Sequence, residues 1–180
     1  MEPRAKLLGH PIHPMLIVFP LGLLATALAF DIVHWAKSGD TFFAHMAVWL
    51  IGLGICTGLF AAIFGLVDWL AVPKGTRAKS IGLWHGLGNV VVVGLFIISW
   101  ALRVAGDVMH PPVGAFVLDI IAVVLALVTG WLGGELVDRL GIGVTPNAHP
   151  DAPSSLKTDT VSPASATARS RATTSSEVRA

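Results

Sequence analysis

Four long apolar runs, separated by short polar stretches, occupy most of the first 144 residues. They lie at 15–35, 46–67, 81–102 and 113–132. An α-helix needs about 20 apolar residues to cross a hydrocarbon layer of roughly 30 Å, and each run meets that length. None alternates polar and apolar residues with a period of two, which excludes a transmembrane β-barrel. The pattern predicts four transmembrane helices.

The links between these runs, at 37–44, 71–80 and 103–112, are short. Short links make neighbouring helices antiparallel. We therefore expect an all-α integral membrane protein, an antiparallel four-helix bundle. Pro20 falls inside the first run and should kink that helix or loosen its first turn. Pro14 suits the first helical position, with His13 as the cap.

The composition changes after Val144. Residues 145–180 number 36, and 24 of them are Ser, Thr, Ala or Pro. Such a segment buries too little apolar surface to offset its chain entropy. We expect two parts, a transmembrane domain at 1–144 and a disordered cytoplasmic tail at 145–180.

Composition and charge narrow the class of protein. The chain is 54% hydrophobic and 13% charged, too apolar for an ordinary soluble protein. The net charge of +1 gives no reason to expect nucleic-acid binding. Ten of the 12 Lys and Arg residues lie on the side of both termini, whereas Lys37 and Arg103 lie on the other. Basic residues favour the cytoplasmic side, so we expect both termini to be cytoplasmic.

Tryptophan and glycine positions add detail to the bundle. Trp35, Trp69, Trp84 and Trp100 fall at the expected ends of helices, where Trp is enriched, whereas Trp49 and Trp131 lie deeper and are expected to pack between helices. Glycines four residues apart favour close helix packing in lipid. Three pairs have this spacing: Gly54 and Gly58, Gly82 and Gly86, Gly130 and Gly134.

Ionisable residues inside or beside the spans form two layers by depth. The inner layer contains His10, His13, Asp68, His85, Asn89 and Glu135. His10 and His13 each precede a proline, which favours extended backbone, and that geometry holds them too far apart to share one metal ion. His85 and Asn89 lie on one helix face, and Asp68 or Glu135 could accept a hydrogen bond from an imidazole.

The outer layer contains Asp31, His34, His45 and Asp119. Charged groups in a span are costly, which makes them functional candidates. Carboxylates that orient histidines are common in metal and haem sites. Both layers also have a simpler explanation. Histidines near an interface contact headgroups and water, and carboxylates near helix ends form caps or interhelical hydrogen bonds.

Several motifs resemble one bacterial membrane family, domain of unknown function 2231. The similarity covers roughly residues 7–144. It rests on Gly9-His10-Pro11-Ile12-His13-Pro14-Met15 with Phe19-Pro20, on Gly65-Leu66-Val67-Asp68-Trp69, on Trp84-His85-Gly86, on Gly130-Trp131-Leu132-Gly133-Gly134-Glu135-Leu136-Val137, and on Gly141-Ile142-Gly143-Val144. The resemblance implies a four-span protein of the bacterial inner membrane, of unestablished activity. It also implies a link to Rieske iron–sulfur proteins, and because this chain lacks the Rieske cysteines, such a centre would belong to a redox partner.

Three functions fit these residues. The first is a redox-linked protein with b-type haem held by histidines of facing helices, His13 or His10 with His85, and His34 with His45. The second is a small transporter or proton relay using Asp31, His34, Asp68, His85 and Asp119, although no inverted repeat is visible and four spans favour a homo-oligomer. The third is a non-catalytic scaffold subunit. No catalytic motif points to an enzyme.

Overall fold

The computed structural model describes residues 1–37, 40–146 and 148–156. The chain divides into two compact units, Met1–Ala148 and His149–Ala180. In the second unit the described residues, 149–156, form neither helix nor strand. Most of the segment expected to be a disordered tail, residues 147 and 157–180, lies outside the described part of the chain.

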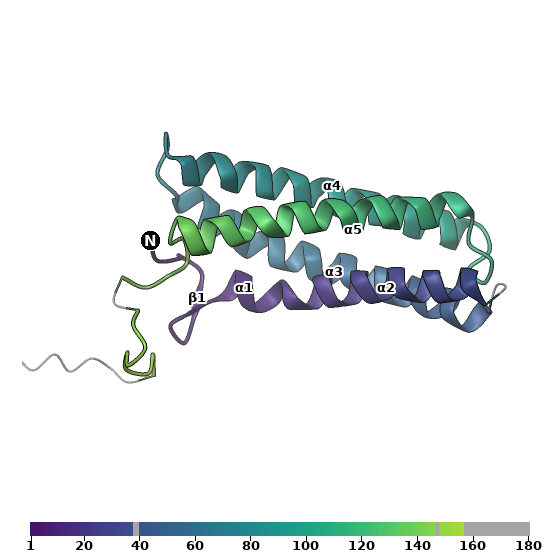
Figure 1. The fold of residues 1–180 in the computed structure, drawn as a ribbon, viewed down its shortest axis with the longest axis horizontal. Helices are drawn as coiled ribbons and strands as arrows, with labels where there is room; N and C mark the ends of the chain where they lie inside the picture. The colour runs from purple at the N-terminus through teal and green to yellow at the C-terminus, as the bar shows by residue number, and fades with distance from the viewer. Residues whose placement is uncertain (38–39, 147, 157–180) are drawn as a thin grey trace, which may run out of the picture. The chain divides into compact units, whose positions relative to one another are not determined.

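The first unit consists of long helices that run alternately up and down (Figure 1). Helices α1 (Ile12–Leu16) and α2 (Val18–Ala36) together form the first span. Helices α3 (Thr41–Ala71) and α4 (Arg77–Ala105) are the second and third. Helix α5 (Val113–Gly134) continues into a π-helical turn, η1 (Glu135–Arg139), and makes the fourth. The prediction of four long apolar helices is confirmed, and each extends beyond its expected run at one end or both.

The first span is interrupted where Pro20 predicts it. Helix α1 ends at Leu16 and α2 begins at Val18, which leaves Ile17 between them. A proline has no N–H, so Pro20 cannot donate to the carbonyl of Leu16 four residues earlier. The loss of this hydrogen bond is the physical reason for the break.

The start of the first span differs from the expectation. Helix α1 begins at Ile12 with Pro11 as its N-cap, so His13 is the second helical residue and not the cap. Pro14 is tolerated there because N–H groups in the first turn need no intrahelical partner. His10 does adopt extended backbone, as the proline after it predicts.

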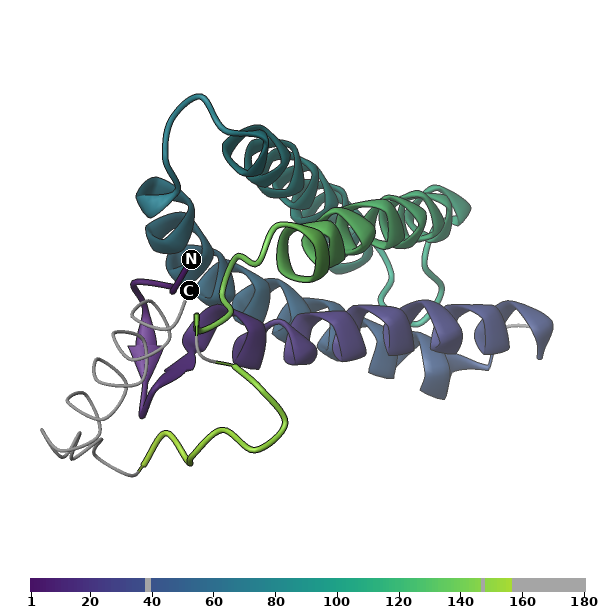
Figure 2. The ribbon, with the colours of Figure 1, turned by 60° about the vertical axis from the view of Figure 1, so that its left-hand side comes forward.

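A short β-hairpin with two residues in each strand precedes the first helix (Figure 2). Strands β1 (Lys6–Leu7) and β2 (His10–Pro11) are antiparallel. Leu8 and Gly9 connect them with φ angles of 51° and 84°. Two positive φ angles are typical of the tight type I′ turn.

Close contacts between helices use only part of the expected glycine pattern. A Cβ on Gly54 would lie 2.5 Å from Leu24, so α2 and α3 touch closely there, and Gly58 faces Pro20 of α2. Gly82 packs under Trp69. The pairing expected for Gly130 and Gly134 is wrong, because a Cβ on either would meet no atom within 4 Å. Glycines therefore let α2 and α3 approach closely. Gly130 and Gly134 do not do the same between α5 and its neighbours.

The two deeper tryptophans lie on the outside of the helices. Trp49 is 62% exposed and Trp131 is 67% exposed. The expectation that they pack between helices is wrong. Their exposure leaves both rings available to lipid.

The two halves of the unit repeat one pattern of buried positions. Leu24, Ala27 and Asp31 in α2 are buried, and so are Phe96, Ser99 and Arg103, each 72 residues later in α4. A shift of 68 residues relates α3 to α5 in the same way, pairing Ala47 with Ala115, Ile51 with Asp119 and Gly54 with Ala122. Each half is an antiparallel helical hairpin that begins at the same end, so this is a parallel repeat. Its equivalent residues Asp31 of α2 and Arg103 of α4 meet through their side chains.

Candidate functional site

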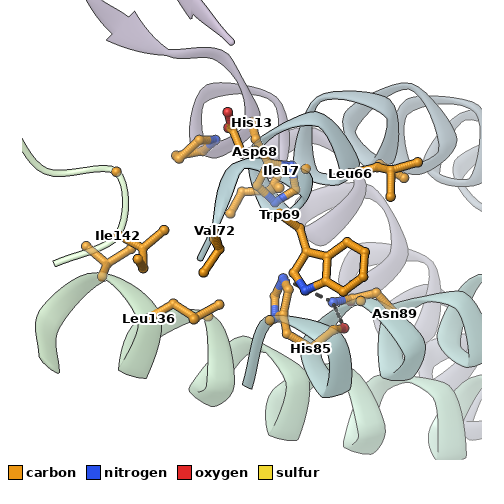
Figure 3. A pocket seen from close by; sticks show the side chains of 18 of the residues that line it. His13, Ile17, Leu66, Asp68, Trp69, Val72, His85, Asn89, Leu136 and Ile142 are labelled. Carbon is orange, nitrogen blue, oxygen red and sulfur yellow. Dashed lines mark hydrogen bonds between the residues drawn. The ribbon is translucent and has the colours of Figure 1, made fainter. Parts of the chain in front are cut away.

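A cavity of about 600 Å³ opens between the helices at the end where α3 is linked to α4. Its lining comes from α1, the end of α3, the start of α4 and the end of α5 with η1. Most of this lining is apolar, and Figure 3 shows His13, Asp68, His85 and Asn89 among the aliphatic side chains. Four residues of the predicted inner layer therefore share one cavity.

His13 is fixed against helix α3. Its Nδ1 lies 2.9 Å from the carbonyl oxygen of Ala61. The ring packs over Gly65, where a Cβ would lie 2.8 Å from Cε1. A carbonyl oxygen only accepts hydrogen bonds, so Nδ1 carries a proton, and in the neutral imidazole the lone pair is on Nε2.

His85 is fixed against helix α5 in the same way. Its Nδ1 lies 2.8 Å from the carbonyl oxygen of Thr129. The ring packs over Gly133, where a Cβ would lie 3.1 Å from Cε1. His85, Thr129 and Gly133 are the repeat counterparts of His13, Ala61 and Gly65, because the same shifts of 72 and 68 relate them. The repeat therefore builds two equivalent histidine sites.

The two imidazole rings lie next to each other, one from each half of the protein. Their centroids are 6.4 Å apart and their planes are perpendicular. Each ring is oriented by its Nδ1 donor bond, so the nitrogen that can bind a metal is Nε2 on both. This pairing of facing helices is what the sequence predicts for His13 and His85.

One feature distinguishes the two histidines. Asn89 donates from Nδ2 to the backbone oxygen of His85 at 2.8 Å and lies 3.4 Å from its Nε2. The hydroxyl of Thr129 donates to Oδ1 of Asn89 at 3.1 Å. In the other half Ile17 stands at the position of Asn89, so the asparagine beside His85 has no counterpart beside His13.

Glycines shape the cavity rather than the helix contacts around it. Gly86, Gly130 and Gly134 all line it, and a Cβ on any of them would meet no atom within 4 Å. Side chains at these positions would project into open space and narrow it. The glycines that spacing assigned to helix packing thus keep the cavity wide.

The other inner-layer residues have different partners from those expected. Oδ1 of Asp68 accepts from the backbone N–H groups of Arg4 and Ala5, at 2.8 and 2.9 Å, and so holds the N-terminal segment instead of an imidazole. Glu135 pairs with Arg77 at 2.6 Å. His10 lies in β2 and does not line the cavity.

The outer layer is organised around an arginine that the sequence pattern did not single out. Arg103 donates to both oxygens of Asp31, at 2.8 and 2.6 Å, and to Oδ2 of Asp119 at 2.6 Å. All three side chains are fully buried. Asp31 and Asp119, which the sequence predicts to lie in one layer, are therefore joined through the cation between them.

Arg103 was expected in the link after the third span, and that placement is wrong. Helix α4 continues to Ala105 and carries Arg103 into the protein interior. A helix can extend past its apolar run when a buried partner neutralises the charge. The signal that could have found it is spacing, because Arg103 follows His85 by the same interval at which Asp31 follows His13.

The two outer histidines have separate partners. Nδ1 of His34 lies 2.8 Å from the backbone oxygen of Asp40. Nε2 of His45 accepts from Nε1 of Trp49 at 3.3 Å. Trp49 lies on the outside of α3, so the partner of His45 points away from the bundle. The arrangement at this end thus lacks the paired orientation seen for His13 and His85.

Comparison with known proteins identifies a family but no activity. The family model described as a predicted membrane protein, DUF2231, matches residues 9–146. No curated protein and no solved structure matches the chain. The matched region contains His13 and His85, most of the cavity lining, and the buried Arg103.

Proposed function

The chain belongs to the DUF2231 family of predicted membrane proteins, and we propose that this member is a redox-linked protein that holds one b-type haem between His13 and His85. The observation that carries the proposal is the pair of adjacent, perpendicular imidazoles, each oriented by a backbone carbonyl. Haem iron in proteins is commonly held by histidine, and four-helix bundles bind cofactors between facing helices.

The separation of the rings suits an iron atom between them. Metal–nitrogen bonds of about 2 Å on both sides, with the radius of each ring added, place two axial imidazoles about 6 Å apart from centre to centre. The centroids of His13 and His85 are 6.4 Å apart. Donation from Nδ1 to a carbonyl is also the usual way in which a protein orients a metal-bound histidine.

The cavity suits a flat apolar ring. Its volume of about 600 Å³ lies within the range of cofactor sites, and the bare backbone at Gly86, Gly130 and Gly134 leaves room for such a ring against α4 and α5. Arg77 and Lys79 flank the cavity residue Ala78 at the membrane end of α4. Arg77 pairs with Glu135, and Lys79 donates to the backbone oxygen of Trp69 at 2.6 Å, so either cation would have to exchange this partner to bind the acidic groups of haem.

Haem would supply one-electron chemistry, and the residues of this chain would hold it. His13 and His85 would bind the iron, the carbonyls of Ala61 and Thr129 would keep both Nε2 atoms pointing inward, and Asn89 would adjust the environment of His85. Because the cavity lies at one end of the helices, the electron partner would dock at that end. A Rieske-type protein is the partner class that the resemblance suggests.

The test is the absorption spectrum of the full-length protein, produced with haem supplied and purified in mild detergent. We expect a Soret band at one haem per chain, and loss of that band in His13→Ala and in His85→Ala. His45→Ala is the matched control, since this histidine lies at the opposite end and bonds to Trp49. It should keep the full spectrum.

Two alternatives predict a different result. A small transporter that uses the buried Asp and His residues, or a scaffold subunit, would be colourless after the same purification. Wild-type protein without a Soret band, or haem binding that survives the replacement of both His13 and His85, would rule out the proposed site.

A further inference from the structure

The buried group formed by Asp31, Arg103 and Asp119 has two acidic side chains and one basic side chain. If both carboxylates were ionised, the group would carry a net charge of −1. All three side chains are fully buried, in helices that are long and apolar enough to span a membrane. An uncompensated charge in such a place is costly, so the group needs one more positive charge.

The repeat shows which residue creates the surplus. Asp31 and Arg103 occupy equivalent positions in α2 and α4 and form a bidentate pair that is neutral by itself. Asp119 occupies the position in α5 that Ile51 occupies in α3, and both are fully buried. The second half of the protein thus has a carboxyl group where the first half has a hydrocarbon side chain.

The hydrogen bonds show which oxygen is available. Both oxygens of Asp31 accept from Arg103. Asp119 accepts from Arg103 through Oδ2 only. Its Oδ1 is buried and has no hydrogen-bond partner, the one such side-chain atom among the described residues. A buried ionised oxygen without a partner is more costly than a neutral hydroxyl.

We propose that this group is a proton-binding site, in which Asp119 takes up one proton on Oδ1 and the group becomes neutral. The step is a simple protonation and needs no other reactant. The proposal is independent of haem binding, since the site lies at the opposite end of the helices from the cavity.

The groups around the site favour the binding of a proton over that of a metal ion. Ser99 of α4 accepts from Nε of Arg103 at 3.4 Å and donates to the backbone oxygen of Ala115 at 3.1 Å. His34 of α2, one turn beyond Asp31, is bonded to the backbone oxygen of Asp40. The buried positions of α3 near this depth are Ala47, Val48 and Ile51, which carry no charge. A metal ion would need several oxygen ligands, and Asp119 offers one free oxygen.

The test is infrared spectroscopy of the full-length protein in liposomes at neutral pH. We expect the carbonyl stretch of a protonated carboxyl group in the wild type, shifted when aspartate is labelled with ¹³C and absent in Asp119→Asn. Asp107→Asn is the control and should leave the band unchanged. The hydrogen bond from His110 lowers the pKa of Asp107, which is exposed in the link between α4 and α5 and so is ionised at this pH.

Two results would overturn the proposal. One is a protonated carboxyl band that is missing from the wild type or insensitive to labelled aspartate, a measurement that needs no variant. The other is a labelled band of full intensity in a folded Asp119→Asn protein.

Discussion

Single buried residues determine the chemistry available to this protein. The Nδ1 atoms of His13 and His85 are held by carbonyl oxygens of neighbouring helices, so each ring can bind a ligand only through Nε2, which in His85 also lies 3.4 Å from Nδ2 of Asn89. Arg103 neutralises the buried carboxylate of Asp31, whose charge would otherwise be costly, and also binds Asp119. Both arrangements depend on side chains meeting from different helices.

Replacing Arg103 should therefore destabilise the protein strongly. Arg103→Gln leaves Asp31 without its bidentate partner, and removing one member of a buried pair typically costs about 3–5 kcal/mol. The free energy of unfolding, measured by denaturant titration in mixed micelles, should fall by that amount. Arg139→Gln, a change at an exposed position of η1, should alter it by less than about 0.5 kcal/mol. Equal effects of the two variants would contradict the buried pairing.

At the scale of helices, glycines have two different roles. Gly54 allows α2 to approach α3, and Gly65 and Gly133 make room for the histidine rings. Gly86, Gly130 and Gly134 instead line a cavity. The spacing of glycines along a helix does not distinguish these roles, because it gives the face of the helix but not what lies against it.

A pair of alanine substitutions separates a packed glycine from a free one. A Cβ on Gly54 would lie 2.5 Å from Leu24, so Gly54→Ala should cost about 1–3 kcal/mol of stability through overpacking. A Cβ on Gly22 of α2 would meet nothing within 4 Å. Gly22→Ala should leave stability unchanged or raise it by up to about 1 kcal/mol. Thermal unfolding in detergent gives the comparison, and a Gly54→Ala protein as stable as Gly22→Ala would show that α2 and α3 do not touch there.

At the scale of the whole membrane unit, the charges favour one orientation. The N-terminal segment, the link between α3 and α4, and η1 carry most of its basic residues. Since Arg103 is buried and paired, Lys37 alone remains at the other end of the helices. The burial of Arg103 makes the asymmetry sharper than the sequence count suggests.

Labelling of single cysteines tests this orientation. In a Cys56→Ala background, Met109→Cys should react with a membrane-impermeant maleimide on intact cells, because the orientation expected from the charges places the link between α4 and α5 outside. Lys74→Cys should react only after the membrane is permeabilised. Labelling in the reverse order would place both termini outside.

The sequence alone determined the four long helices and the break before Pro20, because hydrophobic length and a missing N–H act locally. It also indicated that His13 and His85 lie at one depth, as do Asp31 and Asp119. Its errors arose where the environment decides. An apolar ring such as that of Trp49 or Trp131 can lie against lipid or between helices, and the sequence does not distinguish the two. A charged residue at the end of an apolar run, such as Arg103, is assigned to a link unless its buried partners are known.

Only the tertiary structure decided which of these residues meet. Ring orientation, a free carboxylate oxygen and the width of a cavity depend on contacts between helices that are distant in the chain. The repeat that relates the two halves is visible in the sequence only as two intervals, 72 and 68 residues, and acquires meaning once the buried positions are known. The family assignment followed from motifs, whereas the paired histidines and the surplus acid next to Arg103 required the packed helices.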